Sequence, residues 1–77
     1  MKKISLVHCK PNHKAKIAEI AGGATLHSRL MSLGIYPGRE ISKVSHIGLR
    51  GPVVIKVGRS ILALGHSIAA KIMMEHP

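Results

Sequence analysis

The sequence predicts a mainly β fold, a small SH3-like barrel of five to six short strands with one helix over one end. Three observations predict it: the chain has only 77 residues, its apolar segments are short and broken by Gly or Pro, and one segment alone has helical spacing. Short strands in so small a chain form a strongly bent antiparallel sheet, which removes its exposed edges by closing on itself. We therefore expect a single domain, residues 1–77, with a thin core.

Alternating apolar and polar residues, or a short apolar run, mark each expected strand. The expected strands are residues 4–7, 14–21, 39–47, 53–57, 61–64 and 72–74. Gly22-Gly23 ends the second strand, and Gly58-Arg59-Ser60 turns the fourth back into a hairpin with the fifth. Between the fifth and sixth strands, Ser67 is expected to cap a short helical turn that runs through Ala70.

The helix is expected over residues 25–33. Leu26, Leu30 and Leu33 recur there at helical spacing and form one apolar stripe. Thr25 precedes the stripe and is the expected N-cap, although no Glu or Gln follows three residues later to complete a capping box.

A sharp stop follows this helix. Gly34 comes directly after the apolar stripe, where a left-handed residue that ends a helix is most easily formed without a Cβ. Pro37-Gly38 then suits the centre of a type II turn, because proline fixes φ and glycine accepts a positive φ. Met31 and Ile35 are expected outside the core, where they and Tyr36 would form an adaptable docking patch; the alternative is that they plug the end of the barrel.

The third strand departs from strict alternation. Ile41 and Val44 are three residues apart, and a β-bulge near Ser42-Lys43 would reconcile them; Lys43 stands where an apolar residue is expected. The expected core consists of the large apolar side chains of these elements: Ile17, Ile20, Leu26, Leu30, Leu33, Ile41, Val53, Ile55, Val57, Leu62, Leu64 and Ile72.

The charge is strongly unbalanced. Twelve Lys and Arg residues face three acidic ones, which gives a formal net charge of +9. Such a surface attracts nucleic acid, the anionic inner leaflet of a membrane, or an acidic protein face. Tyr36 is the one aromatic residue, so the chain lacks the stacking platform of single-strand nucleic-acid binders, and nucleic acid is the less favoured partner. A single cysteine, no signal-peptide pattern and no run of membrane-spanning length predict a cytoplasmic protein.

Catalysis is not expected. Gly65-His66-Ser67 imitates the turn that carries a serine nucleophile, but only Glu75 and His76 follow it as partners for a triad. No glycine spacing matches a phosphate-binding loop, and three carboxylates in the whole chain supply acid–base chemistry poorly. The sequence therefore predicts neither an enzyme nor a resident cofactor.

A metal site is a weaker hypothesis. His8, Cys9 and His13 lie close together in the sequence, and thiol and imidazole ligands suit zinc, copper or ferrous iron. Their spacing matches no standard site, and no second pair of ligands accompanies them. A small metal-binding protein therefore stays open as an alternative.

The pattern around the helix end resembles a known signature. The run Arg29-Leu30, Leu33-Gly34-Ile35 and Pro37-Gly38 resembles that of FeoA proteins, small cytoplasmic accessory proteins of bacterial ferrous iron uptake. Gly22-Gly23 before the helix and Gly51-Pro52 before the hairpin extend the likeness. The same module is similar to the C-terminal domain of iron-dependent repressors. The resemblance implies an SH3-like barrel without enzymatic activity, and a partner, the FeoB membrane transporter with its cytoplasmic GTPase domain.

We hypothesise that the helix end and the turn bind this partner. The side chains concerned are Arg29, Met31, Ile35 and Tyr36, with Arg50 from a loop expected to be their neighbour. Positive charge would also hold the protein at the periphery of the inner membrane. Open edge strands would allow a homo-oligomer, and a basic SH3-like module that binds nucleic acid non-specifically is the alternative function.

Overall fold

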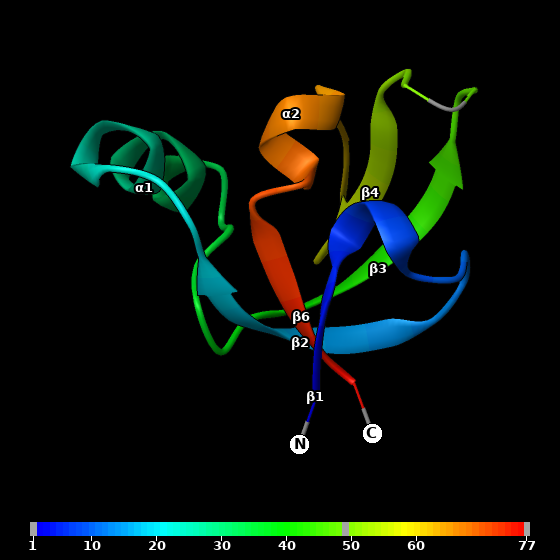
Figure 1. Cartoon of the computed structure of the whole chain (residues 1–77), viewed down its shortest axis with the longest axis horizontal. Coiled ribbons are helices and arrows are strands. Elements are labelled where there is room, and N and C mark those ends of the chain that lie inside the picture. Colours follow the sequence, from blue (N-terminus) through cyan, green and yellow to red (C-terminus); the bar gives the residue numbers. More distant parts are fainter. Residues whose placement is uncertain (1, 49, 77) are drawn as a thin grey trace.

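The computed structural model, which describes residues 2–48 and 50–76, is an antiparallel sheet with a helix projecting at one end (Figure 1). Its six strands are β1 (Lys2–Ser5), β2 (Lys14–Ile20), β3 (Glu40–His46), β4 (Val53–Val57), β5 (Ser60–Leu64) and β6 (Ile72–His76). The helical segments are the 3₁₀ turn η1 (Leu6–His8), the helix α1 (Ala24–Ser32) and the short α2 (His66–Ala69). The predicted mainly β class, with one substantial helix, is confirmed.

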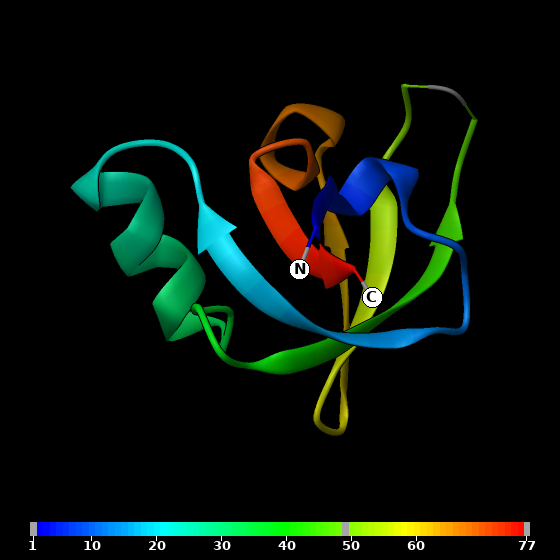
Figure 2. The same cartoon turned by 60° about the horizontal axis from the view of Figure 1, so that its bottom comes forward.

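The sheet curls strongly without closing (Figure 2). Its strand order is β1-β6-β2-β3-β4-β5, so β1 and β5 are its two free ends, and the prediction of a closed barrel is wrong. The chain leaves β5 into α2, which contacts η1, and the Ser5 hydroxyl donates a hydrogen bond to the Ala70 carbonyl at 3.1 Å. Helical turns therefore join the two ends of the sheet where a closed barrel would have a ladder.

The β4–β5 hairpin follows the sequence closely. Val57 pairs directly with Ser60, which leaves Gly58 and Arg59 as a two-residue loop. Gly58 has a φ of 59° at the first central position, as a type II′ turn requires, and the twist of that turn matches the twist of the strands.

The core fills the concave face of the sheet, and most of the predicted side chains are in it. The buried apolar residues are Leu6, Ile17, Ile20, Leu30, Ile35, Ile41, Val53, Ile55, Val57, Leu64, Ala69, Ile72 and Met74. Leu26 and Leu62 are only half-buried and pack against this cluster from outside. The first strand ends at Ser5, two residues earlier than predicted, and the tight turn of η1 carries Leu6 into the core.

The third strand has the predicted bulge, one residue further along. Lys43 pairs with Ile55 and Ser45 with Val54, so the extra residue is Val44, not Ser42 or Lys43. Alternation in fact holds up to this point: Ile41 and Lys43 both face inward and are buried, while Val44 is exposed. The inward position is occupied by a lysine because backbone carbonyls there accept its ammonium protons, as described below.

Both predicted helix caps are wrong. Gly23 is the N-cap of α1 and Gly65 is the N-cap of α2, each with an extended ψ and without a side-chain cap hydrogen bond. Thr25 and Ser67 each lie two residues after the N-cap, inside the first turn of the helix, and therefore cannot act as the cap.

We expect core isoleucines to dominate stability. Ile55→Ala removes a side chain with 0 % exposure and should lower the free energy of unfolding by about 2–5 kcal/mol, because a cavity is added to the lost burial. Ile61→Ala is the matched control, since Ile61 is 58 % exposed, and should change it by less than about 0.5 kcal/mol. Urea unfolding followed by circular dichroism measures both. Equal losses for the two variants would contradict the described core.

Candidate partner-binding site

The end of α1 is a Schellman motif built around Gly34. The Gly34 N–H donates to the Met31 carbonyl and the Ile35 N–H donates to the Leu30 carbonyl, both at 2.9 Å. Gly34 has a φ of 85°, the left-handed conformation that this motif needs at its first residue beyond the cap. The predicted role of Gly34 as the residue that ends the helix is confirmed.

This motif decides which side chains of the corner are exposed. In a Schellman motif the second residue beyond the cap packs against the helix three positions before the cap, and here these residues are Ile35 and Leu30, 0 % and 2 % exposed. Ile35 therefore has no surface to offer a partner, which corrects its place in the predicted patch. Leu33 is the cap residue itself and is 47 % exposed, so its predicted place in the core is wrong. Met31 is exposed, as predicted.

The turn after the helix is tied to the sheet. The Arg39 N–H donates to the Tyr36 carbonyl at 3.1 Å, and Gly38 has a φ of 91°, which confirms the predicted type II turn. The Gly38 N–H donates to the Ile17 carbonyl at 2.8 Å, and the Ile17 N–H donates to the Arg39 carbonyl at 2.9 Å. Backbone bonds to β2 thus fix the turn, and with it the helix end.

Tyr36 is half-buried and has a partner in Arg39 that the sequence did not indicate. The Arg39 guanidinium donates to the Tyr36 hydroxyl at 3.4 Å and lies 6.0 Å from the centre of the ring. The phenol is therefore held against the surface of the turn and offers only part of its ring to a partner.

Arg50 is exposed but does not belong to this corner. The connection between β3 and β4, which contains it, lies at the opposite end of the sheet from α1 in both views (Figures 1 and 2). The seven residues of β3 separate the two ends, which at about 3.3 Å per residue is roughly 23 Å. The prediction that Arg50 neighbours the helix end is wrong.

We name the exposed side chains of Arg29, Met31 and Leu33, with the half-buried Tyr36, the helix corner. The last turn of α1 and its cap therefore expose two apolar side chains and one cation at the end of a protruding helix. A flexible methionine and an exposed leucine are typical of surfaces that bind another protein. The position of Arg29 in the last turn of α1 is also favourable, because a cation there faces the negative end of the helix dipole.

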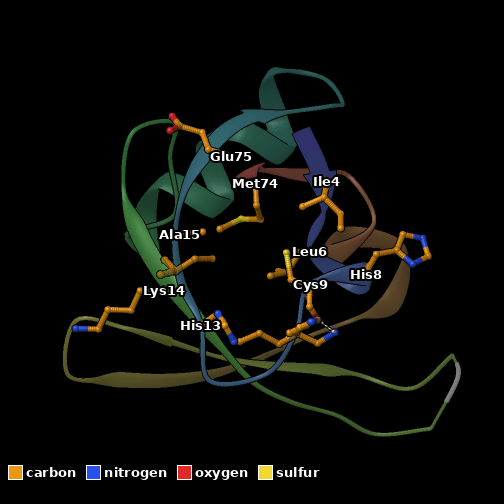
Figure 3. Close-up of a pocket in the computed structure, with 12 residues that line it drawn as sticks. Ile4, Leu6, His8, Cys9, His13, Lys14, Ala15, Met74 and Glu75 are labelled. Carbon is orange, nitrogen blue, oxygen red and sulfur yellow. Dashed lines mark hydrogen bonds between the residues drawn. The ribbon is translucent and has the colours of Figure 1, made fainter. Parts of the chain in front are cut away.

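The three candidate metal ligands lie around a cavity but do not converge (Figure 3). The sulfur of Cys9 points into this cavity, whereas the ring of His8 points away from it. Within residues 2–48 and 50–76, no group of three or more His, Cys, Asp or Glu side chains could hold a metal ion. His8 is the last residue of η1 and Cys9 follows with an extended backbone, so these two neighbouring side chains point in different directions.

Cys9 is held as a thiol. Burial raises the pKa of its side chain above the ordinary 9.0, and the nearby charge of Lys43 only partly opposes this. The thiol donates a hydrogen bond to the Ser5 carbonyl, with the sulfur 3.6 Å from the oxygen. Metal ligation and nucleophilic attack both need the thiolate, so this environment favours neither.

The family model of the FeoA domain matches residues 4–76. The chain belongs to the FeoA family. A putative Fe(2+) transport protein A of Methanocaldococcus jannaschii is 31 % identical over 70 residues, which are 91 % of this chain and 83 % of that protein.

Solved structures show how far the FeoA fold extends. A crystal structure of an iron uptake regulatory protein (FeoA) is 28 % identical, with a TM-score of 0.84 and 97 % of each chain covered. A manganese-dependent transcriptional repressor is 16 % identical, with a TM-score of 0.83 over 94 % of this chain and 40 % of the repressor. The second likeness concerns the fold alone. In the described part of this FeoA chain, no helix is long and apolar enough to cross a bilayer.

The helix end of this FeoA protein is expected to be sensitive to a Cβ at Gly34. Gly34→Ala places alanine in the left-handed region and should lower the free energy of unfolding by about 1–2 kcal/mol. Gly23→Ser is the control, because Gly23 has an extended backbone, open space around it and the N-cap position that serine favours. Urea denaturation compares them, and an unchanged midpoint for Gly34→Ala would contradict the motif.

Cys9 should be slow to alkylate. Because its pKa is raised, little thiolate is present at pH 8, and the reaction with iodoacetamide should be slower than that of the urea-unfolded chain. The rate should still increase as the pH rises beyond 9.0. Mass spectrometry of timed samples measures both rates. Equal rates in the folded and unfolded chains at pH 8 would contradict the raised pKa of this partly buried thiol.

Proposed function

We propose that this chain is a non-enzymatic accessory protein of ferrous iron uptake that binds the cytoplasmic side of the FeoB transporter and modulates it. The observation that carries the proposal is the FeoA match over residues 4–76, together with an exposed apolar corner on a chain of that family. The similarity to a putative Fe(2+) transport protein supports the iron connection. The FeoB partner follows from the resemblance of the helix-end signature.

The helix corner is the surface we assign to this contact. Binding energy in protein interfaces is concentrated in a few central side chains that lose their water, with polar groups around them. Met31 and Leu33 are 61 % and 47 % exposed, so they have apolar area to bury, and the exposed Arg29 in the last turn of α1 supplies a cation. The Schellman motif holds their backbone in place, which reduces the entropy lost on binding.

Positive charge supports a position beneath a membrane. The formal net charge is +9, and each Lys or Arg near an anionic leaflet contributes about 1 kcal/mol of attraction. The same charge accelerates encounter with an acidic protein face. Charge alone gives no specificity, which in this proposal comes from the apolar corner.

The competing functions have weaker support. Nucleic acid would have to be held by phosphate contacts alone, because the ring of Tyr36 is half-buried against Arg39 and is not a stacking platform. A metal carrier built on His8, Cys9 and His13 would need ligands that converge and a thiolate. Neither condition matches the geometry described above.

Met31→Asp should abolish most of the binding to the purified GTPase domain of the transporter. A buried charge without a partner replaces an apolar contact, so we expect Kd to rise at least about tenfold, or 1.4 kcal/mol, by titration calorimetry. Ile61→Asp is the matched control, because the substitution makes the same change in charge. Ile61 lies on β5 and is 58 % exposed, compared with 61 % for Met31. This control should leave Kd within about twofold, since a rim charge matters little.

Leu33→Asp tests the corner a second time and should act like Met31→Asp. Equal weakening by Ile61→Asp would show that charge, and not the corner, governs binding. Binding of the unmodified chain to the GTPase domain that disappears at high salt would show that exposed charges, and not the apolar corner, hold the complex together.

A further inference from the structure

A cavity of about 360 Å³ lies between the N-terminal segment and the concave face of the sheet (Figure 3). Its floor is apolar: Leu6, Ile41 and Met74 are buried there, and Ile4 and Ala15 line it from β1 and β2. This volume lies within the usual range of small-molecule sites, about 300–1,000 Å³. Neither the helix corner nor the proposed contact with the transporter uses this space.

One wall of the cavity carries a buried cation. Lys43 is 4 % exposed, and its ammonium donates to the carbonyls of Val7 and Cys9, each at 3.0 Å. An ammonium has three protons, so one remains after these two bonds. Among the residues that the structure describes, the one ion pair is Lys3–Glu19, on the surface, and no carboxylate lies within 4.0 Å of Lys43.

A buried charge without a counter-ion is costly, and an anion beside it removes much of that cost. The rim of the cavity has the same preference. Lys10, His13 and Lys14 line it, with Glu75 as the single acidic residue of the lining. A bound anion is therefore attracted by the positive charges at the rim and by the ammonium of Lys43.

We propose that this cavity binds a small amphipathic anion, an aliphatic chain with one carboxylate. The aliphatic chain covers the floor of Leu6, Ile41 and Met74, and the carboxylate accepts the remaining proton of Lys43. Phosphate and sulfate fit less well, because an apolar floor cannot replace the water that such strongly hydrated ions lose. A neutral or cationic amphiphile buries the same chain but leaves Lys43 without a counter-ion.

The unmodified chain with three probes of equal chain length provides the first test. Octanoate, octanol and octylamine are titrated separately into ¹⁵N-labelled protein, below their aggregation concentrations, and followed by ¹H–¹⁵N spectra. We expect octanoate to bind at least tenfold more tightly than the other two. The amide signals of Val7, Cys9 and Asn12 should shift, since these residues border Lys43 or bond to its backbone. Equal binding of the three probes, or none, would overturn the proposal.

Two variants give an independent check. Lys43→Met keeps the length of the side chain but removes its charge, and should lose the preference for octanoate; Lys16→Met, on the exposed face of β2, makes the same charge change and should keep it. Ala15→Leu fills the cavity while leaving Lys43 in place, and should weaken octanoate binding at least tenfold. This variant decides the matter even where Lys43→Met does not fold. Octanoate binding unchanged in Ala15→Leu would overturn the proposed site.

Discussion

The hydrogen bond from the Ile35 N–H to the Leu30 carbonyl, closed around Gly34, is the constraint on which the functional surface depends. It reverses the chain within a single residue of the helix end, so that Ile35 enters the core while Met31 and Leu33 remain outside. The turn that follows is bonded to Ile17 of β2, and the position of α1 is therefore set by the sheet. Backbone hydrogen bonds thus hold both the helix end and the turn, and a corner fixed in this way suits a surface that binds another protein.

A second constraint acts at the other side of the sheet. Lys43 is a charged residue at an inward-facing position of β3. Its ammonium donates hydrogen bonds to the carbonyls of Val7 and Cys9, and these bonds attach the N-terminal segment to the sheet. The Asn12 N–H, which donates to the Lys43 carbonyl at 2.6 Å, makes the same attachment from the backbone. The segment thereby becomes one wall of an apolar cavity that keeps a positive charge. Corner and cavity are separate in space, which is why contact with a partner and binding of a small anion can be tested separately.

Much of the fold could be predicted from local patterns. The β4–β5 hairpin, the end of α1 at Gly34 and the type II turn at Pro37-Gly38 rest on backbone rules that tertiary contacts do not override.

The site could be predicted only in part. Spacing alone predicts Leu33 as the last residue of a buried stripe. Because Gly34 is left-handed, Ile35 is buried there and Leu33 is exposed. The packing rule of the Schellman motif, in which the second residue beyond the cap contacts the helix, could have predicted this exchange. Hydrophobicity likewise favoured Val44 over Lys43 as the inward residue, because two carbonyl acceptors from a distant segment are invisible in the sequence. The length of β3 separates Arg50 from the corner, and the end of η1 at His8 turns the side chains of His8 and Cys9 in different directions. Residue spacing in the sequence shows neither effect.

Contact at the helix corner can be followed in methyl spectra of the protein, labelled with ¹³C at its methionine methyl groups, as the transporter's GTPase domain is added. We expect the Met31 methyl signal to shift or broaden, while that of Met74, a buried residue of β6, stays unchanged. An unchanged Met31 signal in a complex that demonstrably forms would contradict this contact.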